Sequence, residues 1–196
     1  PDGVEEDTIV GEHDAIFARL AATPDGTRVY ATRTFHDDII AVSADDLSLI
    51  ATIDVGGDPT DVDLSTDGTR AYVSVNTSPG RTVVVDTDPS SPTYHTVLHS
   101  IVLSGNGALG VGVHPDGNEV LGLSQRPGAG TIHGIDTTSH TITRSVTPSA
   151  GGSAPTLQEA VFSPDGSRGF ASIFQSTGSS NVVTFSMDSL SITGGI

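Results

Sequence analysis

The sequence predicts an all-β protein made of about four similar units, each a sheet of four short antiparallel strands. An Asp-Gly pair flanked by apolar runs recurs four times, and Gly26, Gly68, Gly117 and Gly166 follow one another at intervals of 42, 49 and 49 residues. The 196 residues include 23 Gly and 11 Pro but no Trp, which favours many short strands and turns over long helices. A period of about 40 to 50 residues in a β-rich chain is typical of a β-propeller.

The Asp-Gly pair is the element on which each unit is built. In the first unit it stands in Pro24-Asp25-Gly26, between two apolar runs. Glycine adopts positive φ without steric cost, so Asp-Gly between apolar runs is a strong signal for a tight hairpin turn. Each pair is therefore expected to join the first and second strands of its unit.

The first unit is expected to span residues 15–57. Its second and third strands are joined by the polar turn Phe35-His36-Asp37-Asp38. The segment 8–10 matches 52–54, which closes this unit, so residues 1–14 are predicted to be the tail of a preceding blade or a strand that closes a ring. Its four strands are predicted at 16–22, 28–32, 39–42 and 49–55.

Three further units follow the same pattern, and residues 1–196 are interpreted as one repeat domain. The last unit is expected to stop inside its outermost strand, so the chain is either a small closed ring or, preferably, an arc of a larger propeller. The units are predicted at 58–105 (strands 62–65, 70–75, 82–86 and 97–103), 106–154 (strands 109–113, 119–123, 131–136 and 141–146) and 155–196 (strands 160–163, 168–174 and 181–185).

Composition excludes several classes of function. The formal net charge is −16, with eight Arg and no Lys, so nucleic acid is not expected as a partner, because phosphate binding needs clustered positive charge. No apolar run of about 18 residues occurs, so membrane insertion is not expected. The absence of Cys rules out disulfides and thiol chemistry. No signal-peptide pattern is visible, although the chain begins in the middle of a repeat.

The repeats resemble the YVTN family of β-propeller repeats, and the resemblance covers nearly the whole chain. It rests on the turn and strand at 23–32, the strand Ala71-Tyr72-Val73-Ser74-Val75-Asn76, the segments 83–87 and 134–137, and the closing strand 52–59. The third and fourth units depart from the pattern, with Leu121 and Phe170 at the tyrosine position. The resemblance implies the propeller fold; it does not imply an activity.

In such a fold, the loops that join second to third strands, and one blade to the next, share one face around the channel mouth. Histidines and carboxylates there could bind a ligand or a hard cation, although ordinary polar loops would have the same composition. No metal-ligand spacing or cofactor motif occurs, so neither a metal nor a cofactor is predicted. The candidate ligand-binding residues on this loop face are His13, Asp14, His36, Asp37, Asp58, Asp61, Arg81, Arg126 and Glu159.

The remaining histidines and serines give no catalytic pattern. His95 and His99 are placed on one strand, where they would stand about 13 Å apart, too far to share a metal ion. No Gly-x-Ser-x-Gly elbow and no phosphate-binding loop followed by a helix is present. No catalytic residue is therefore assigned.

These observations predict a non-enzymatic binding or scaffold propeller. It would present its loop face to a protein or glycan partner from the cell surface, the periplasm or the extracellular space; oligomeric state is left open. Similar seven-bladed proteins open sugar lactones, so the alternative is a lactonase-like hydrolase with a channel metal, for which Asp61 and Glu159 are the candidate acids. A subunit of a periplasmic redox enzyme is a weaker alternative, because the chain has neither Trp nor Cys.

Overall fold

The computed structural model describes residues 16–125, 130–148, 156–174 and 180–195, and these form four antiparallel sheets of four strands each. In every sheet the strands follow one another in chain order. The sheets consist of β1 (Ile16–Ala22), β2 (Arg28–Thr34), β3 (Asp38–Ser43) and β4 (Leu49–Asp54); β5 (Asp58–Leu64), β6 (Arg70–Asn76), β7 (Arg81–Asp86) and β8 (Val97–Val102); β9 (Ala108–Val113), β10 (Glu119–Ser124), β11 (Thr131–Asp136) and β12 (Ile142–Val146); and β13 (Thr156–Phe162), β14 (Arg168–Phe174), β15 (Ser180–Ser186) and β16 (Ser191–Gly195).

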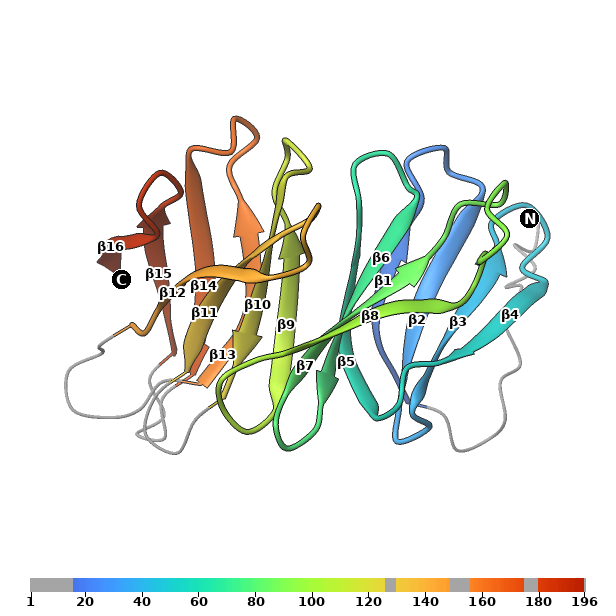
Figure 1. The fold of residues 1–196 in the computed structure, drawn as a ribbon, viewed down its shortest axis with the longest axis horizontal. Coiled ribbons are helices and arrows are strands. Elements are labelled where there is room, and N and C mark those ends of the chain that lie inside the picture. Colours follow the sequence, from blue (N-terminus) through green and yellow to red (C-terminus); the bar gives the residue numbers. More distant parts are fainter. Residues whose placement is uncertain (1–15, 126–129, 149–155, 175–179, 196) are drawn as a thin grey trace, which may run out of the picture.

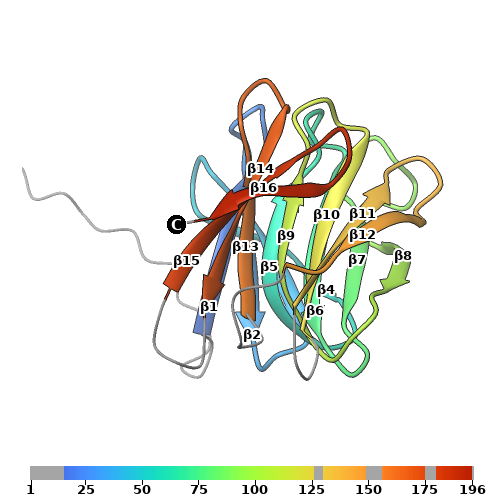
Figure 2. The ribbon, with the colours of Figure 1, turned by 90° about the vertical axis from the view of Figure 1, so that its left-hand side faces the viewer.

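The four sheets stand side by side as blades. Figure 1 shows them in a row from the first blade (β1–β4) to the fourth (β13–β16), and Figure 2 views the row from the end of the fourth blade. The first strands of neighbouring blades pack against each other, β1 on β5, β5 on β9 and β9 on β13. This arrangement confirms the predicted all-β fold of propeller blades. The first and fourth blades lie at opposite ends of the row in Figure 1, which therefore has the form of an open arc.

The Asp-Gly turns join the first and second strands of each blade as expected. Gly26, Gly68, Gly117 and Gly166 all have φ between 70° and 76°. In the first turn the Asp25 carboxylate accepts hydrogen bonds from the Thr27 amide (3.0 Å) and the Thr27 hydroxyl (2.8 Å). The turn is thus determined by its own residues, which is why it can be recognised in the sequence.

The core lies between the blades. Tyr30 and Ile39 of the first blade pack with Val73 and Val85 of the second, and similar clusters fill the next two interfaces. A blade between two others must bury both of its faces, so β6 and β7 are apolar at successive positions instead of alternating with polar residues. Glycine allows a close approach between blades: a Cβ built at Gly110 of β9 would lie 2.5 Å from the Gln158 carbonyl oxygen of β13.

The fourth blade corrects one prediction. Its fourth strand was expected to be mostly missing, whereas Ser191–Gly195 pairs with β15 as β16 and completes the sheet. The sequence Ser-Ile-Thr-Gly-Gly has weak strand propensity, so only pairing with β15 identifies it as a strand. The first strand begins at Thr156, four residues earlier than expected, with a bulge between Leu157 and Ala160. The predicted segment 8–10, and with it the question of a closing strand, lies outside the described residues.

Candidate functional site

The inner strands form a groove that contains two of the predicted site residues. Arg19 of β1, Asp61 of β5 and Glu159 of β13 line it together with apolar side chains such as Val111 and Val161. Its volume is about 290 Å³. Asp61 and Glu159 are almost a hundred positions apart in the chain, and the packing of the blades brings both to the lining of this groove.

Asp61 is the most strongly perturbed acid of the groove. Only 6% of the residue is exposed, and its carboxylate accepts hydrogen bonds from the amides of Val62 (2.9 Å) and Val111 (3.0 Å). Burial, with a smaller contribution from the nearby Glu159 carboxylate, raises the pKa of Asp61 to about 6. The two amide bonds and the Arg19 guanidinium, whose Nε lies 3.9 Å away, oppose this rise. The Asp61 carboxyl thus changes charge close to neutral pH.

Asp63, two residues further along β5, makes the same kind of bonds. It accepts from the amides of Leu64 (2.8 Å) and Val113 (2.8 Å), and burial raises its pKa as well. Both side chains therefore connect β5 of the second blade to β9 of the third. This shared pattern gives Asp61 a structural role in addition to its place in the groove.

The predicted loop face contains a tightly held turn between β2 and β3. Phe35 has φ +71° and Asp37 φ +59°, a region that bulky residues rarely adopt. The Phe35 amide donates to the Asp58 carboxylate of the second blade (2.8 Å). Arg33 pairs with Asp38 through two hydrogen bonds of 2.7 and 2.6 Å across the base of the turn. The Phe35 residue is 74% exposed, more than any other large hydrophobic residue described.

The structure thus groups only some of the predicted residues. His36 and Asp37 share the turn that Asp58 holds, and these three lie at one place on the loop face. Arg81 instead donates hydrogen bonds to the Gly56 carbonyl and the Thr77 hydroxyl. It thereby connects the segment that precedes β5 to the turn between β6 and β7. His13, Asp14 and Arg126 lie outside the described residues. Sequence reasoning placed Phe35 in a polar turn and did not single it out; its apolar side chain among polar neighbours was the available signal.

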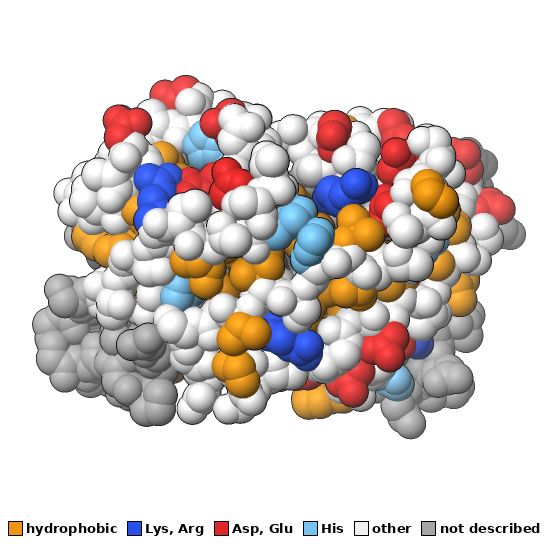
Figure 3. All heavy atoms as spheres, viewed as in Figure 1, with side chains coloured by type: hydrophobic (Ala, Val, Ile, Leu, Met, Phe, Trp, Pro, Cys, Tyr) orange, Lys and Arg blue, Asp and Glu red, His pale blue; other side chains and the backbone are white. Residues whose placement is uncertain are grey.

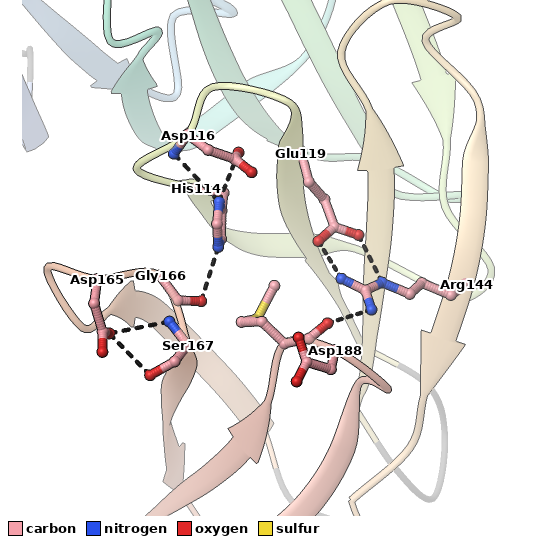
Figure 4. A pocket seen from close by; sticks show the side chains of 9 residues that line it. His114, Asp116, Glu119, Arg144, Asp165, Gly166, Ser167 and Asp188 are labelled. Atoms are coloured by element: carbon pink, nitrogen blue, oxygen red, sulfur yellow. Dashed lines mark hydrogen bonds and ion pairs between the residues drawn. The ribbon is translucent and has the colours of Figure 1, made fainter.

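A second cavity, of about 350 Å³, lies on the opposite face between the third and fourth blades. Figure 4 shows that Glu119 is paired with Arg144 and Asp116 with His114, whereas Asp165 accepts hydrogen bonds from Ser167. Arg144 of β12 makes a two-point ion pair with Glu119 of β10, with 2.7 Å between Nε and Oε1, and also donates to the Met187 carbonyl. This pair neutralises the charge of Glu119, and no sequence pattern had indicated the cavity.

His114 joins the two blades in the same cavity (Figure 4). Its Nε2 lies 2.9 Å from the Gly166 carbonyl oxygen and its Nδ1 lies 2.7 Å from the Asp116 carboxylate. Burial disfavours the imidazolium, but the bonds to Gly166 and Asp116 outweigh burial and raise the pKa of His114. The ring also meets Phe162 edge to face. His114 therefore acts as a contact between the Asp-Gly turns of adjacent blades.

Two further kinds of feature, a metal centre and a membrane-spanning helix, concern the described residues 16–125, 130–148, 156–174 and 180–195. Within those ranges, no group of three or more His, Cys, Asp or Glu side chains is arranged to hold a metal ion. The same residues contain no helix of the length and apolarity needed to cross a membrane.

Comparison with known proteins supports the fold and leaves the family open. No protein-family model matches the chain, and no curated protein matches it. Among solved structures, the chain is similar to hydrazine synthase of Kuenenia stuttgartiensis, with a TM-score of 0.77 and 22% sequence identity. The match covers 87% of this chain and 51% of that one, so the chain spans about half the length of its structural neighbour. At this identity the likeness concerns the fold alone: the described chain is an arc of β-propeller blades.

Proposed function

We propose that this protein is a non-catalytic binding propeller, whose loop face contacts a protein or glycan through Phe35. The observation that carries the proposal is the turn at Phe35, in which a large apolar side chain is both highly exposed and held in an unfavourable backbone conformation. Such strain persists only where surrounding structure enforces it, and it gathers at functional sites.

The turn is prepared for binding because its contacts fix it before any partner arrives. Asp58 holds the Phe35 amide, the Arg33–Asp38 pair closes the base, and the Asp37 carbonyl accepts from the Val55 amide (2.9 Å). A rigid aromatic anchor loses little conformational entropy on binding. Aromatic faces also stack on sugar rings, and carboxylates such as that of Asp37 accept hydrogen bonds from sugar hydroxyls, so both partner classes suit this surface. A cell-surface or secreted location is part of this proposal.

The test is a site-specific photo-crosslinker at position 35, combined with an array of immobilised oligosaccharides. In cells of the source organism, the proposal expects a discrete adduct from position 35 and none from a crosslinker at Val97, an exposed hydrophobic residue on β8. On the array, Phe35→Ala is expected to abolish glycan signals that Val97→Ala retains. Equal behaviour of the two positions in both assays would overturn the proposal.

The groove favours a second candidate, a lactonase-like hydrolase. Asp61 and Glu159 lie in one groove, and a carboxyl with a pKa of about 6 is suited to act as a general base near neutral pH. Hydrolysis of γ- and δ-sugar lactones, with and without divalent cations, tests it. Asp61→Asn should abolish turnover while Asp63→Asn, which alters the same kind of amide bonds, retains it. Equal turnover in both variants would exclude Asp61 as the base.

The likeness to hydrazine synthase gives a redox-subunit alternative support at the level of fold only. None of the described residues that form the groove or the second cavity adds an observation in its favour. Binding of a protein or glycan through the loop face is therefore the function that the geometry supports best.

A further inference from the structure

Two histidines from neighbouring blades meet on the outer surface, away from the groove and the loop face. His99 lies on β8, the edge strand of the second blade, and His140 lies in the turn between β11 and β12 of the third. Their rings stack with centroids 3.9 Å apart and planes inclined by 28°. A patch of histidine is visible near the middle of the face drawn in Figure 3.

The surroundings of His140 suit a neutral ring. Its φ is +54°, and its amide donates to the Asp136 carbonyl (2.9 Å), which fixes the turn. The Nδ1 atom is buried and has no hydrogen-bond partner among the described residues. A neutral imidazole carries a proton on one nitrogen only, whereas imidazolium carries one on both. An imidazolium here would therefore bury an N–H donor without an acceptor, a cost that the neutral form with an unprotonated Nδ1 avoids.

The charges around His140 act in the same direction. Burial lowers the pKa of His140, and the neighbouring His99 and Arg70 lower it further, while Asp136 opposes them. These groups come from β8, from β6 and from the turn of His140 itself. The position of the ring between two blades, and not its own turn alone, therefore disfavours its charged form.

The two carboxylates closest to this group of charges already have partners. Asp136 accepts hydrogen bonds from the amides of Thr138 (3.1 Å) and Ser139 (2.7 Å) in its own turn. Asp86 of β7 accepts a hydrogen bond from Nη1 of Arg70 at 2.9 Å. Both negative charges are thus engaged elsewhere, which limits their ability to stabilise a second imidazolium.

We propose that the stacked pair of His99 and His140 is a pH-sensitive contact between the second and third blades, closed when both rings are neutral and opened by acid. Two imidazolium rings at this separation repel each other, because each positive charge disfavours the other. The folded protein disfavours the proton on His140, so it binds fewer protons than the unfolded chain below the ordinary histidine value of 6.5. The contribution of the pair to stability is therefore full above about pH 6.5 and is lost as the pH falls below it.

The response to acid is expected to be local. In its sheet β8 is hydrogen-bonded to β7 alone, so its outer side depends on contacts such as the histidine pair. Deeper in the same interface, Ile101 and Leu103 of the second blade pack with Val120 and Ile135 of the third. These apolar contacts do not titrate, so acid opens the outer end of the interface and leaves its core closed.

Amide hydrogen exchange of the full chain tests the proposal at about pH 7.5 and about pH 5, with the intrinsic rates at each pH taken into account. Protection of β8 and of the turn at 137–140 should fall by about threefold or more at the lower pH. Protection of β10, in the core of the same interface, should be retained. An equal loss in β10 would show general unfolding in acid and would overturn the proposal.

Two variants remove the charge while preserving the local structure. His99→Phe keeps an aromatic ring that cannot take up a proton, and His140→Asn keeps a φ of +54°, which asparagine tolerates. In both variants the protection of β8 should no longer depend on pH. His36→Phe, on the loop face, is the matched control and should lose protection in acid as the original chain does.

Nuclear magnetic resonance of the imidazole rings gives a readout that does not depend on exchange. His140 should titrate below pH 6.5, and His99→Phe should raise the pKa of His140, because a like charge is removed. The proposal is overturned if His140 takes up its proton without any loss of protection in β8, or if His99→Phe loses protection in acid as the original chain does. It is also overturned if His36→Phe abolishes the response.

Discussion

The first blade has a turn at each end, and the two turns are stabilised in different ways. At the Asp25-Gly26 turn, glycine takes the positive φ and the Asp25 carboxylate accepts hydrogen bonds from the Thr27 amide and hydroxyl, so the bonds that shape the turn come from within a few residues. At the Phe35 turn, residues with side chains take positive φ, and a carboxylate 23 positions further along the chain holds the first of them. One turn is determined locally, and the other depends on the packing of two blades.

This difference separates architecture from function. Local turns recur in all four blades and set the fold, since a short sequence can specify them anywhere. Contacts from a neighbouring blade can hold a bulky residue at a positive φ that is locally unfavourable. The Phe35 turn is held in this way, so its side chain is presented in a fixed position. The same logic applies to the groove and to the histidine pair, which no single blade contains.

The largest expected effect concerns Gly80, in the turn between β6 and β7 on the loop face. A Cβ at this position would lie 2.4 Å from the backbone carbonyl carbon and oxygen of Gly107 in the connection to the third blade. Because backbone cannot move aside as a side chain can, Gly80→Ala should lower the free energy of unfolding by about 3 kcal/mol. Urea unfolding of the original chain and of the variant measures this loss. An effect as small as that of Gly26→Ala would show that blade-to-blade packing does not constrain this turn.

A smaller loss is expected for Gly26→Ala in the local turn. A Cβ there meets no atom within 4 Å, so only the φ of +70° is unfavourable. The left-handed region costs a residue with a Cβ about 1 kcal/mol, and the free energy of unfolding should fall by that amount. Gly26→Asn should lose less, since asparagine tolerates this region. Equal losses for the two variants would contradict a purely conformational origin.

Phe35→Asn should produce the opposite sign. The Phe35 side chain makes little buried contact, and asparagine relieves the strain of φ +71° without the added chain entropy of glycine. We expect a gain of about 0.5 kcal/mol in the free energy of unfolding, accompanied by loss of the proposed binding. Thermal and urea unfolding measure the gain. A loss of stability would mean that the Phe35 ring is packed and does not serve as an exposed anchor.

A further prediction concerns the titration of the Asp61 carboxyl. Its folded pKa of about 6 lies above the ordinary value of 3.8, so the folded state binds more protons between these values. Its contribution to stability is therefore full below pH 3.8 and is lost as the pH rises through about 6. Carbon-13 NMR of the Asp61 carboxyl follows the titration directly.

Two variants sharpen this titration. Glu159→Gln should lower the pKa of Asp61, because a nearby negative charge is removed, and Arg19→Gln should raise it. If neither variant moves the titration, the side chains do not share a groove in solution.

The architecture could be predicted because its signals are short-range. The blades and nearly all of their strands were predicted from the Asp-Gly pairs, the spacing of these pairs and the apolar runs. The exceptions have weak local signals: β16 is Ser-Ile-Thr-Gly-Gly, and the start of β13 lies beside a bulge. Both segments become strands because they pair with a neighbouring strand. Local strand propensity does not include the stabilisation that comes from this pairing.

The candidate sites were predicted less completely. Asp61 and Glu159 were named as acids near the channel, but the pKa of Asp61 depends on burial and on groups from the three other blades. His99 was considered beside His95 along one strand, whereas its actual neighbour is His140 of the next blade. His114 reaches Gly166 in the same way. Each of these contacts joins residues tens of positions apart in the chain.

The sequence by itself determined the repeating blade, because hairpin turns and apolar faces follow from residues close together in the chain. Only the tertiary structure decided which side chains meet between blades. The physical reason is that strand register and the curvature of the arc depend on how whole sheets pack. They decide three meetings between blades: Asp61 with Glu159, His99 with His140, and Phe35 with Asp58.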